Sequence, residues 1–89
     1  MKRLRTVVRG RVQGVGYRAT TAQQGKQQGI AGWVRNLMDG SVEVVAEGDD
    51  QAMLAFVDYL RRGPNGARVT NVDTEWTDAR SDLQGFEIR

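Results

Sequence analysis

The chain has 89 residues, enough for one modest hydrophobic core, so we expect residues 1–89 to form a single domain. It contains no cysteine and no histidine, which excludes a disulfide framework, a thiolate nucleophile, imidazole base catalysis and most zinc sites. Hydrophobic residues make up 39% of the chain without any long apolar run, so neither a signal peptide nor a membrane span is expected, and the expected location is cytoplasmic.

Basic residues gather at the start of the chain, although the net charge is only +2. Residues 1–18 contain no acidic side chain. A local positive field of this kind favours small anions or nucleic acid as ligands, and a solvated basic face is the alternative. The basic side chains concerned are Lys2, Arg3, Arg5, Arg9, Arg11 and Arg18.

Residues 3–12 are predicted to form a half-buried strand, because apolar or small side chains alternate there with arginines. Only Val7 interrupts the alternation. The side chains expected on the inner face are Leu4, Thr6, Val8 and Val12.

A glycine-rich turn follows this strand and precedes a helix predicted over residues 18–28. Its glycines (Gly10, Gly14 and Gly16) allow positive φ and a close approach of a ligand to the backbone. Such a turn directs several N–H groups into one concavity, with the positive end of the helix dipole behind them. Arg18 adds a planar guanidinium that matches two phosphate oxygens. We therefore predict a phosphate site formed by Gln13, Gly14, Val15, Gly16, Tyr17 and Arg18.

The helix predicted over residues 18–28 has a weak apolar stripe, with Ala19 and Ala22 as its small members. Gly25 lies in its interior, where glycine costs about 1 kcal/mol relative to alanine. Tyr17 and Trp33 are predicted to be core residues beside the phosphate site, and stacking against a substrate is the alternative.

Two strands joined by a hairpin are predicted next, over residues 32–37 and 41–47. The Asp39-Gly40 pair between them is a strong hairpin signal. In the second strand, Glu43 and Glu47 lie opposite the apolar face, where they could pair with the arginines of the first strand if the two strands are neighbours. We expect such pairs to be surface pairs of little energetic weight.

The clearest helix signal begins after Asp49 or Asp50, either of which is a plausible N-cap. Gly63 and Pro64 are suited to its C-terminal end. Its apolar stripe has helical spacing and consists of Met53, Phe56, Val57 and Leu60. Strands are then predicted over residues 69–77, with Val72, Thr74 and Trp76 on one side, and around residues 86–88.

The predicted order is therefore βαββαβ with a short additional C-terminal strand. Two helices of this length can cover only one face of the sheet, which gives a two-layer α+β sandwich. Split βαβ units in this order build the ferredoxin-like fold. That fold hosts enzymes, RNA-binding modules and small-molecule sensors, so it does not by itself decide the function.

The chain lacks the usual equipment for phosphate chemistry, because no His or Cys nucleophile exists and no carboxylate cluster flanks the glycine turn. Hydrolysis of an ordinary phosphate monoester is not expected, since that uncatalysed reaction is among the slowest known. A mixed anhydride of phosphate and a carboxylic acid differs, because its leaving group is a carboxylate with a conjugate acid of pKa about 4. Positioning, charge stabilisation and one oriented water can then suffice.

Asn36 is the candidate for orienting that water. Its amide oxygen can accept a hydrogen bond from water while its NH₂ group donates elsewhere. In this hypothesis the proton of the water passes to an oxygen of the substrate's own phosphate, so no base of the protein is needed.

Segments along the whole chain resemble the acylphosphatase family: residues 10–18, 32–36, 39–40, 42–44, 61–69 and 86–89. The resemblance implies a ferredoxin-like sandwich that hydrolyses carboxyl-phosphate bonds of small-molecule acyl phosphates without metal or cofactor. It also implies that Arg18, which closes the first motif, binds the phosphate and that Asn36, which follows Gly-Trp-Val-Arg, orients the attacking water. The departures from the family pattern are Thr20, Gly25 and Gln28, and they concern the packing of the first helix.

Two other functions remain as alternatives. The basic N-terminal strand is compatible with an RNA-binding module, but the interleaved aromatic residues of an RNP1 motif are absent. A non-catalytic anion-sensing domain, like those fused to larger carbamoyl-transfer proteins, is the second. The favoured interpretation is an acylphosphatase that is monomeric and binds neither nucleic acid nor membrane.

Overall fold

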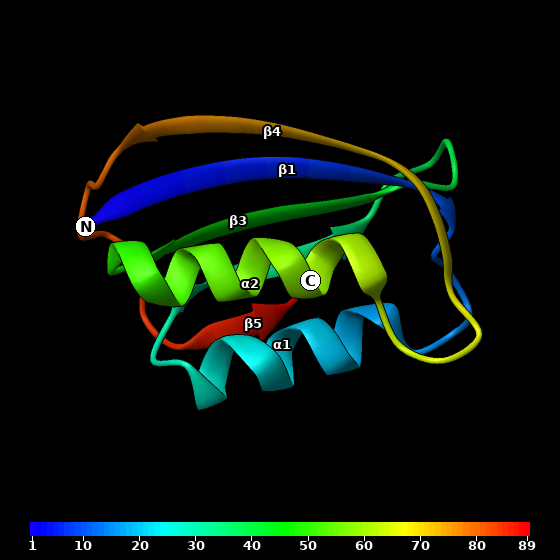
Figure 1. Cartoon of the computed structure of the whole chain (residues 1–89), viewed down its shortest axis with the longest axis horizontal. Helices are drawn as coiled ribbons and strands as arrows, with labels where there is room; N and C mark the ends of the chain where they lie inside the picture. Colours follow the sequence, from blue (N-terminus) through cyan, green and yellow to red (C-terminus); the bar gives the residue numbers. More distant parts are fainter.

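The computed structural model describes residues 1–89 and has the element order βαββαβ followed by a short fifth strand (Figure 1). The predicted order is therefore confirmed, and the predicted bounds of the elements agree with the observed ones to within a few residues. The elements are β1 (Lys2–Arg11), α1 (Tyr17–Gln27), β2 (Ala31–Asn36), β3 (Val42–Gly48), α2 (Asp50–Arg62), β4 (Arg68–Asp78) and β5 (Phe86–Ile88).

The strands form one sheet in the order β4-β1-β3-β2-β5. Every pair of neighbours is antiparallel except β2 and β5, which run parallel. Both helices lie on one face of this sheet, and β4 forms the edge beyond them (Figure 1). The two-layer α+β sandwich of ferredoxin-like type is thus confirmed. Its helices have 11 and 13 residues, and neither is long and apolar enough to cross a membrane.

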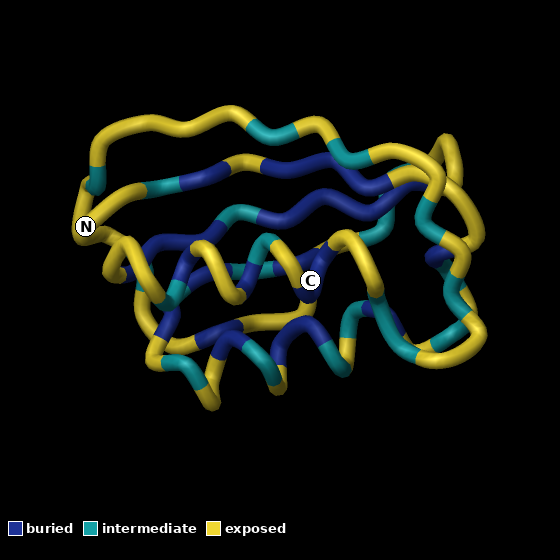
Figure 2. Tube along the Cα trace, viewed as in Figure 1, coloured by how far each residue is buried: buried dark blue, intermediate teal, exposed yellow.

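The core lies between the helices and the inner face of the sheet, and the central strand β3 is the most buried strand (Figure 2). All four side chains predicted for the inner face of the first strand are buried. In α2, Asp49 is the N-cap and its side chain accepts from the N–H of Ala52 at 2.8 Å, as the sequence suggested. Of the predicted stripe, Met53, Phe56 and Leu60 are buried and Val57 is half-buried.

The edge strand β4 carries no buried residue. Val72, Thr74 and Trp76 do share one side, because they pair with the inward-facing residues Val8, Thr6 and Leu4 of β1. Val72 is half-buried and packs against the core, whereas Trp76 is 43% exposed. The shared side of β4 is therefore only partly covered.

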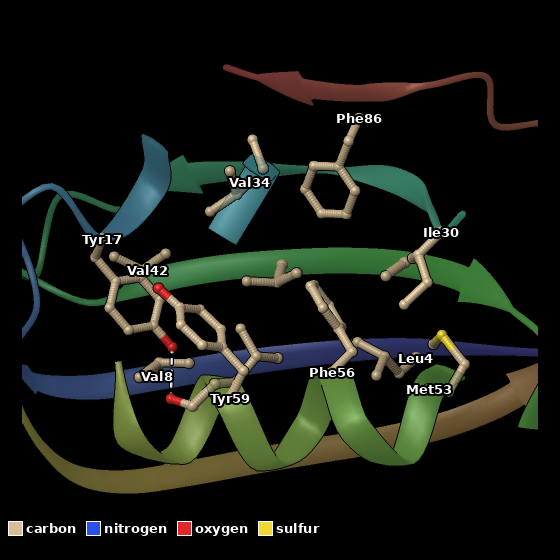
Figure 3. Packing of buried hydrophobic residues seen from close by; sticks show 14 of the residues in the cluster. Leu4, Val8, Tyr17, Ile30, Val34, Val42, Met53, Phe56, Tyr59 and Phe86 are labelled. Carbon is tan, nitrogen blue, oxygen red and sulfur yellow. Dashed lines mark hydrogen bonds between the residues drawn. The ribbon is translucent and has the colours of Figure 1, made fainter. Parts of the chain in front are cut away.

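Gly25 is required by the packing of α1 on β5, which corrects the interpretation that it is a weak point. A Cβ atom at this position would lie 2.3 Å from Cδ2 of Phe86. The ring of Phe86 in turn packs against Phe56, with centroids 5.7 Å apart, and points from β5 toward α2 (Figure 3). The helix has a thin apolar stripe because its backbone, rather than large side chains, contacts the ring.

Thr20, another departure from the family pattern, also has a structural role, because its hydroxyl forms hydrogen bonds. Its hydroxyl lies 3.0 Å from the carbonyl oxygen of Gly16, to which it can donate, and accepts a hydrogen bond from the hydroxyl of Tyr59. These contacts join the start of α1 to α2. A polar side chain at this position of α1 is therefore explained by a hydrogen bond between the two helices.

The outer face of the sheet carries ion pairs between β1, β3 and β2. Glu43 accepts hydrogen bonds from Arg5 and Arg35, each at 2.6 Å, and is only 4% exposed. Burial opposes ionisation of the Glu43 carboxyl, but the hydrogen bonds from the two arginines outweigh it and lower its pKa. The predicted pairing is confirmed, whereas its description as a surface pair is wrong because the carboxylate is buried.

Glu47 makes the second predicted pairing and also fixes the segment before β5. Its carboxylate lies 3.9 Å from Arg3 and is 2% exposed. It also accepts from the backbone N–H groups of Ser81 and Arg80 at 2.7 and 3.2 Å. The approach of the chain to β5 is therefore held by a buried carboxylate.

Candidate active site

The glycine turn begins with a bulge at the end of β1. The pairing of β1 with β4 shifts register between Arg9 and Gly10. A Cβ atom on Gly10 would lie 2.0 Å from the carbonyl oxygen of Arg68, and its φ is +123°. Only glycine fits there, and the bulge directs the chain away from the sheet toward α1.

The residues before α1 form a loop with free N–H groups. Gly14 and Gly16 have φ values of +75° and +79°. None of the backbone N–H groups of residues 13–16 donates a hydrogen bond within the chain. Gly16 is the N-cap of α1 and offers no side-chain acceptor to its first turn. Several N–H donors without acceptors in the chain therefore lie beside the positive end of the helix dipole, as an anion site requires.

Two glycines of this loop, Gly14 and Gly16, and the start of α1 line a hollow of about 180 Å³. This volume is below the range of roughly 300–1,000 Å³ that clefts for drug-sized ligands occupy, so it suits a small group. The residues that line the hollow come from the end of β1, the loop, α1, β2 and β5, and they are Val12, Gly14, Gly16, Tyr17, Arg18, Ala19, Asn36 and Ile88.

The structure brings together most, but not all, of the residues predicted for the site. Gly14, Gly16, Tyr17, Arg18 and Asn36 line the hollow. The two remaining predicted residues, Gln13 and Val15, lie in the same loop but do not line it. Sequence reasoning missed the following lining residues: Val12, Ala19 and Ile88.

Of the three missed residues, two could have been found from the sequence and one could not. Val12 and Ala19 flank the glycine turn in sequence, so their proximity to a site formed by that turn could have been anticipated. Ile88 gave no local signal, because only its parallel pairing with Val34 of β2 brings it beside the strand that ends at Asn36.

Arg18 contributes the one positive charge in the lining of the hollow. It forms no ion pair with an Asp or Glu side chain. Its Nη1 donates a hydrogen bond of 3.3 Å to the main-chain oxygen of Arg89, just after β5. The guanidinium is therefore held at the hollow by a main-chain oxygen and not by an Asp or Glu side chain.

Asn36 is the last residue of β2 and lies opposite Val42 in the hairpin. Its Oδ1 atom is buried and accepts no hydrogen bond from the chain. A buried acceptor without a donor is unfavourable by about 1–3 kcal/mol, and such groups in folded proteins call for a functional explanation.

Tyr17 is a core residue beside the hollow, as predicted, with 1% of its surface exposed. Its hydroxyl donates at 2.6 Å to the carbonyl of Leu60 near the end of α2, a bond drawn as a dashed line in Figure 3. The usual helical donor to that carbonyl would be residue 64, which is a proline without N–H. Burial, and to a lesser degree the neighbouring Tyr59, raises the pKa of the Tyr17 hydroxyl, so it remains a donor.

Trp33 does not belong to the core beside the hollow, so that prediction is wrong. It alternates with the buried Val34 along β2 and therefore lies on the outer face of the sheet. The guanidinium groups of Arg35 and Arg89 lie 5.3 and 4.8 Å from the centre of its ring. Its aromatic face is occupied by these two cations.

Comparisons with known proteins agree with one another. The Acylphosphatase family model matches residues 4–88. An acylphosphatase of Anaeromyxobacter dehalogenans (strain 2CP-C) is 51% identical over 87 residues, which cover 98% of this chain and 94% of that protein. An acylphosphatase of Methylococcus capsulatus is 55% identical over 88 residues, which cover 99% of this chain and 96% of that protein. The crystal structure of acylphosphatase from Bacillus subtilis superposes with a TM-score of 0.96 at 35% identity, covering 100% of this chain and 99% of that one.

Proposed function

Because the chain belongs to the acylphosphatase family and is an acylphosphatase enzyme, we propose that it hydrolyses acyl phosphates in the hollow at the start of α1. One observation carries this proposal. The uncapped start of α1 with the guanidinium of Arg18, and Asn36 at the end of β2 with an unpartnered amide oxygen, come from two separate segments and line one hollow.

In the proposed complex the phosphoryl group occupies the loop. The backbone N–H groups of Gln13, Gly14, Val15, Gly16 and Tyr17 donate to its oxygens, and the guanidinium of Arg18 binds two of them. Support comes from the free N–H groups of the loop and from the absence of an Asp or Glu partner for Arg18. These charges and dipoles are fixed before the reaction, so they stabilise the transition state without reorganisation.

In the proposed reaction a water molecule oriented by Asn36 attacks phosphorus. A bond forms between the water oxygen and phosphorus, and the bond from phosphorus to the acyl oxygen breaks with its electron pair. The carboxylate leaves, and a proton of the water passes to a phosphoryl oxygen to give dihydrogen phosphate. Asn36 Oδ1 is buried, so in the proposed complex the amide turns about its soft χ2 torsion for this oxygen to accept from the water.

The acyl end of the substrate is proposed to lie against the outer part of the hollow. Ala19 and Ile88 are the exposed apolar residues of its lining, and the only charge there belongs to Arg18. A carboxylate of pKa about 4 needs no proton donor to leave. We therefore propose a reaction without metal, cofactor or protein acid.

The test is hydrolysis of benzoyl phosphate by the purified protein in excess EDTA, with inorganic phosphate as competitive inhibitor. Arg18→Ala should lower phosphate affinity and kcat/KM by about 30- to 1,000-fold, since a charge-assisted contact of about 2–4 kcal/mol is removed. Asn36→Ala should keep phosphate affinity within about threefold and lose turnover. Arg62→Ala is the matched control, because this arginine pairs only with Asp58 on the surface, and it should behave as the parent.

Each outcome has a distinct meaning. Turnover of Asn36→Ala at the parental rate would show that another group orients the water. Unchanged inhibition of Arg18→Ala by phosphate would show that the phosphoryl group does not bind in the loop beside Arg18. Loss of all hydrolysis in EDTA, restored by a divalent cation, would contradict the metal-free reaction.

A further inference from the structure

The side chain of Gln13 joins the loop before α1 to the hairpin between β2 and β3. Its Nε2 atom donates to the carbonyl oxygens of Leu37 and Ser41, at 2.8 and 2.9 Å. Both hydrogens of the amide are thereby used. Gln13 does not line the hollow, so its side chain has no donor left for a substrate phosphate.

The two acceptors belong to the closing pair of the hairpin. The N–H of Leu37 donates to the carbonyl of Ser41 at 2.8 Å, and the N–H of Gly40 donates to the carbonyl of Leu37 at 3.2 Å. Each carbonyl therefore uses its second lone pair for Gln13. Leu37 directly follows Asn36, so the side chain of Gln13 binds the chain one residue from the group proposed to orient the water.

These are the only hydrogen bonds between residues 12–16 and residues 36–41. The loop and the end of β2 are otherwise built from separate parts of the sheet, because β3 lies between β1 and β2. The position of the loop relative to Asn36 therefore depends on this side chain.

We propose that Gln13 is a positioning residue, which fixes the distance between the phosphoryl group in the loop and the side chain of Asn36. The inference rests on the proposed function, because it takes the loop and Asn36 as the two halves of the site. A misplacement of about 1 Å between reacting groups costs on the order of 100-fold in rate. Gln13 thus acts on turnover through Asn36 and not on phosphate affinity.

Gln13→Met tests this, because methionine has similar length but no N–H donor. We expect kcat for benzoyl phosphate to fall by about 10- to 100-fold, while the dissociation constant of inorganic phosphate changes by less than about threefold. Parental kcat, or an equal loss of phosphate affinity and kcat, would overturn the proposal. If Gln13→Met does not fold, Gln13→Asn, which keeps the donors on a shorter side chain, should show the same split.

Asp39→Ala is the matched control. Its Oδ1 accepts from the N–H and the hydroxyl of Ser41 and so supports the same hairpin without contacting Gln13. Asp39→Ala should keep kcat within about threefold of the parent. A loss of kcat as large as that of Gln13→Met would show that the integrity of the hairpin, and not the bond from the loop, sets the rate.

A double-mutant cycle with Asn36→Ala separates positioning from general damage. If Gln13 acts through Asn36, Gln13→Met should lower the residual kcat of Asn36→Ala by less than about twofold. A multiplicative loss in the double variant would overturn the inference. The proposed role of Asn36 fails separately, when Asn36→Ala alone keeps the parental rate. An inactive Asn36→Ala beside a fully active Gln13→Met refutes only the role of Gln13.

Discussion

Gly25→Ala should destabilise the protein, although helix propensity predicts the opposite. In an exposed helix interior, alanine is favoured over glycine by about 1 kcal/mol. Here the added methyl carbon would lie 2.3, 2.6 and 2.9 Å from three atoms of the Phe86 ring. Carbon atoms attract optimally at about 3.5–4.0 Å, so helix and ring must separate by more than about 1 Å.

The ring has little room for that movement. Phe86 is 5% exposed and packs against Phe56 on the side of α2. Overpacking of a well-packed core costs about 1–3 kcal/mol, and the confinement of the ring favours the upper part of this range. After subtraction of the propensity gain, the free energy of unfolding of Gly25→Ala should fall by about 1–2 kcal/mol.

Urea unfolding at 25 °C, followed by circular dichroism, measures this change in the parent and in a Phe86→Leu background. Leucine lacks the ring atoms that meet the new methyl group, so Gly25→Ala should be neutral or stabilising by up to about 1 kcal/mol in that background. A rise in stability of about 1 kcal/mol in the parent background would refute the packing argument. Equal effects in both backgrounds would show that Phe86 is not the opposing group.

Three further predictions concern buried polar groups. Tyr17→Phe should lower the free energy of unfolding by about 1–3 kcal/mol in urea titrations, because the Leu60 carbonyl loses its donor and Pro64 cannot replace it; an unchanged midpoint would contradict this. Thr21→Val should raise it by about 1 kcal/mol, because the buried hydroxyl of Thr21 has no partner, and a decrease would show that this hydroxyl is bonded. The lowered pKa of Glu43 means that its ion pairs stabilise the fold fully above the ordinary value of about 4.5 and that this contribution is lost as pH falls through the folded-state pKa. Urea midpoints measured from pH 7 to pH 3 should therefore fall less steeply for Glu43→Gln than for the parent, and parallel curves would contradict the assignment.

Local signals in the sequence were sufficient for the order of the elements and for much of the site. The N-cap at Asp49, the Asp39-Gly40 turn and the alternation of β1 each depend on a few neighbouring residues. For the same reason the glycine turn and Arg18 could be recognised as a site for an anion, since the donors and the guanidinium are adjacent along the chain.

Tertiary structure decided how distant segments meet. The place of Ile88 at the hollow, the requirement for Gly25 and the burial of Glu43 each depend on strands or helices far apart in sequence. Trp33 illustrates the limit, because an aromatic residue in a strand suggests the core, yet its register places it on the outer face under two guanidinium groups. Periodicity defines which residues share a face, whereas only the packing of other elements determines whether that face is covered.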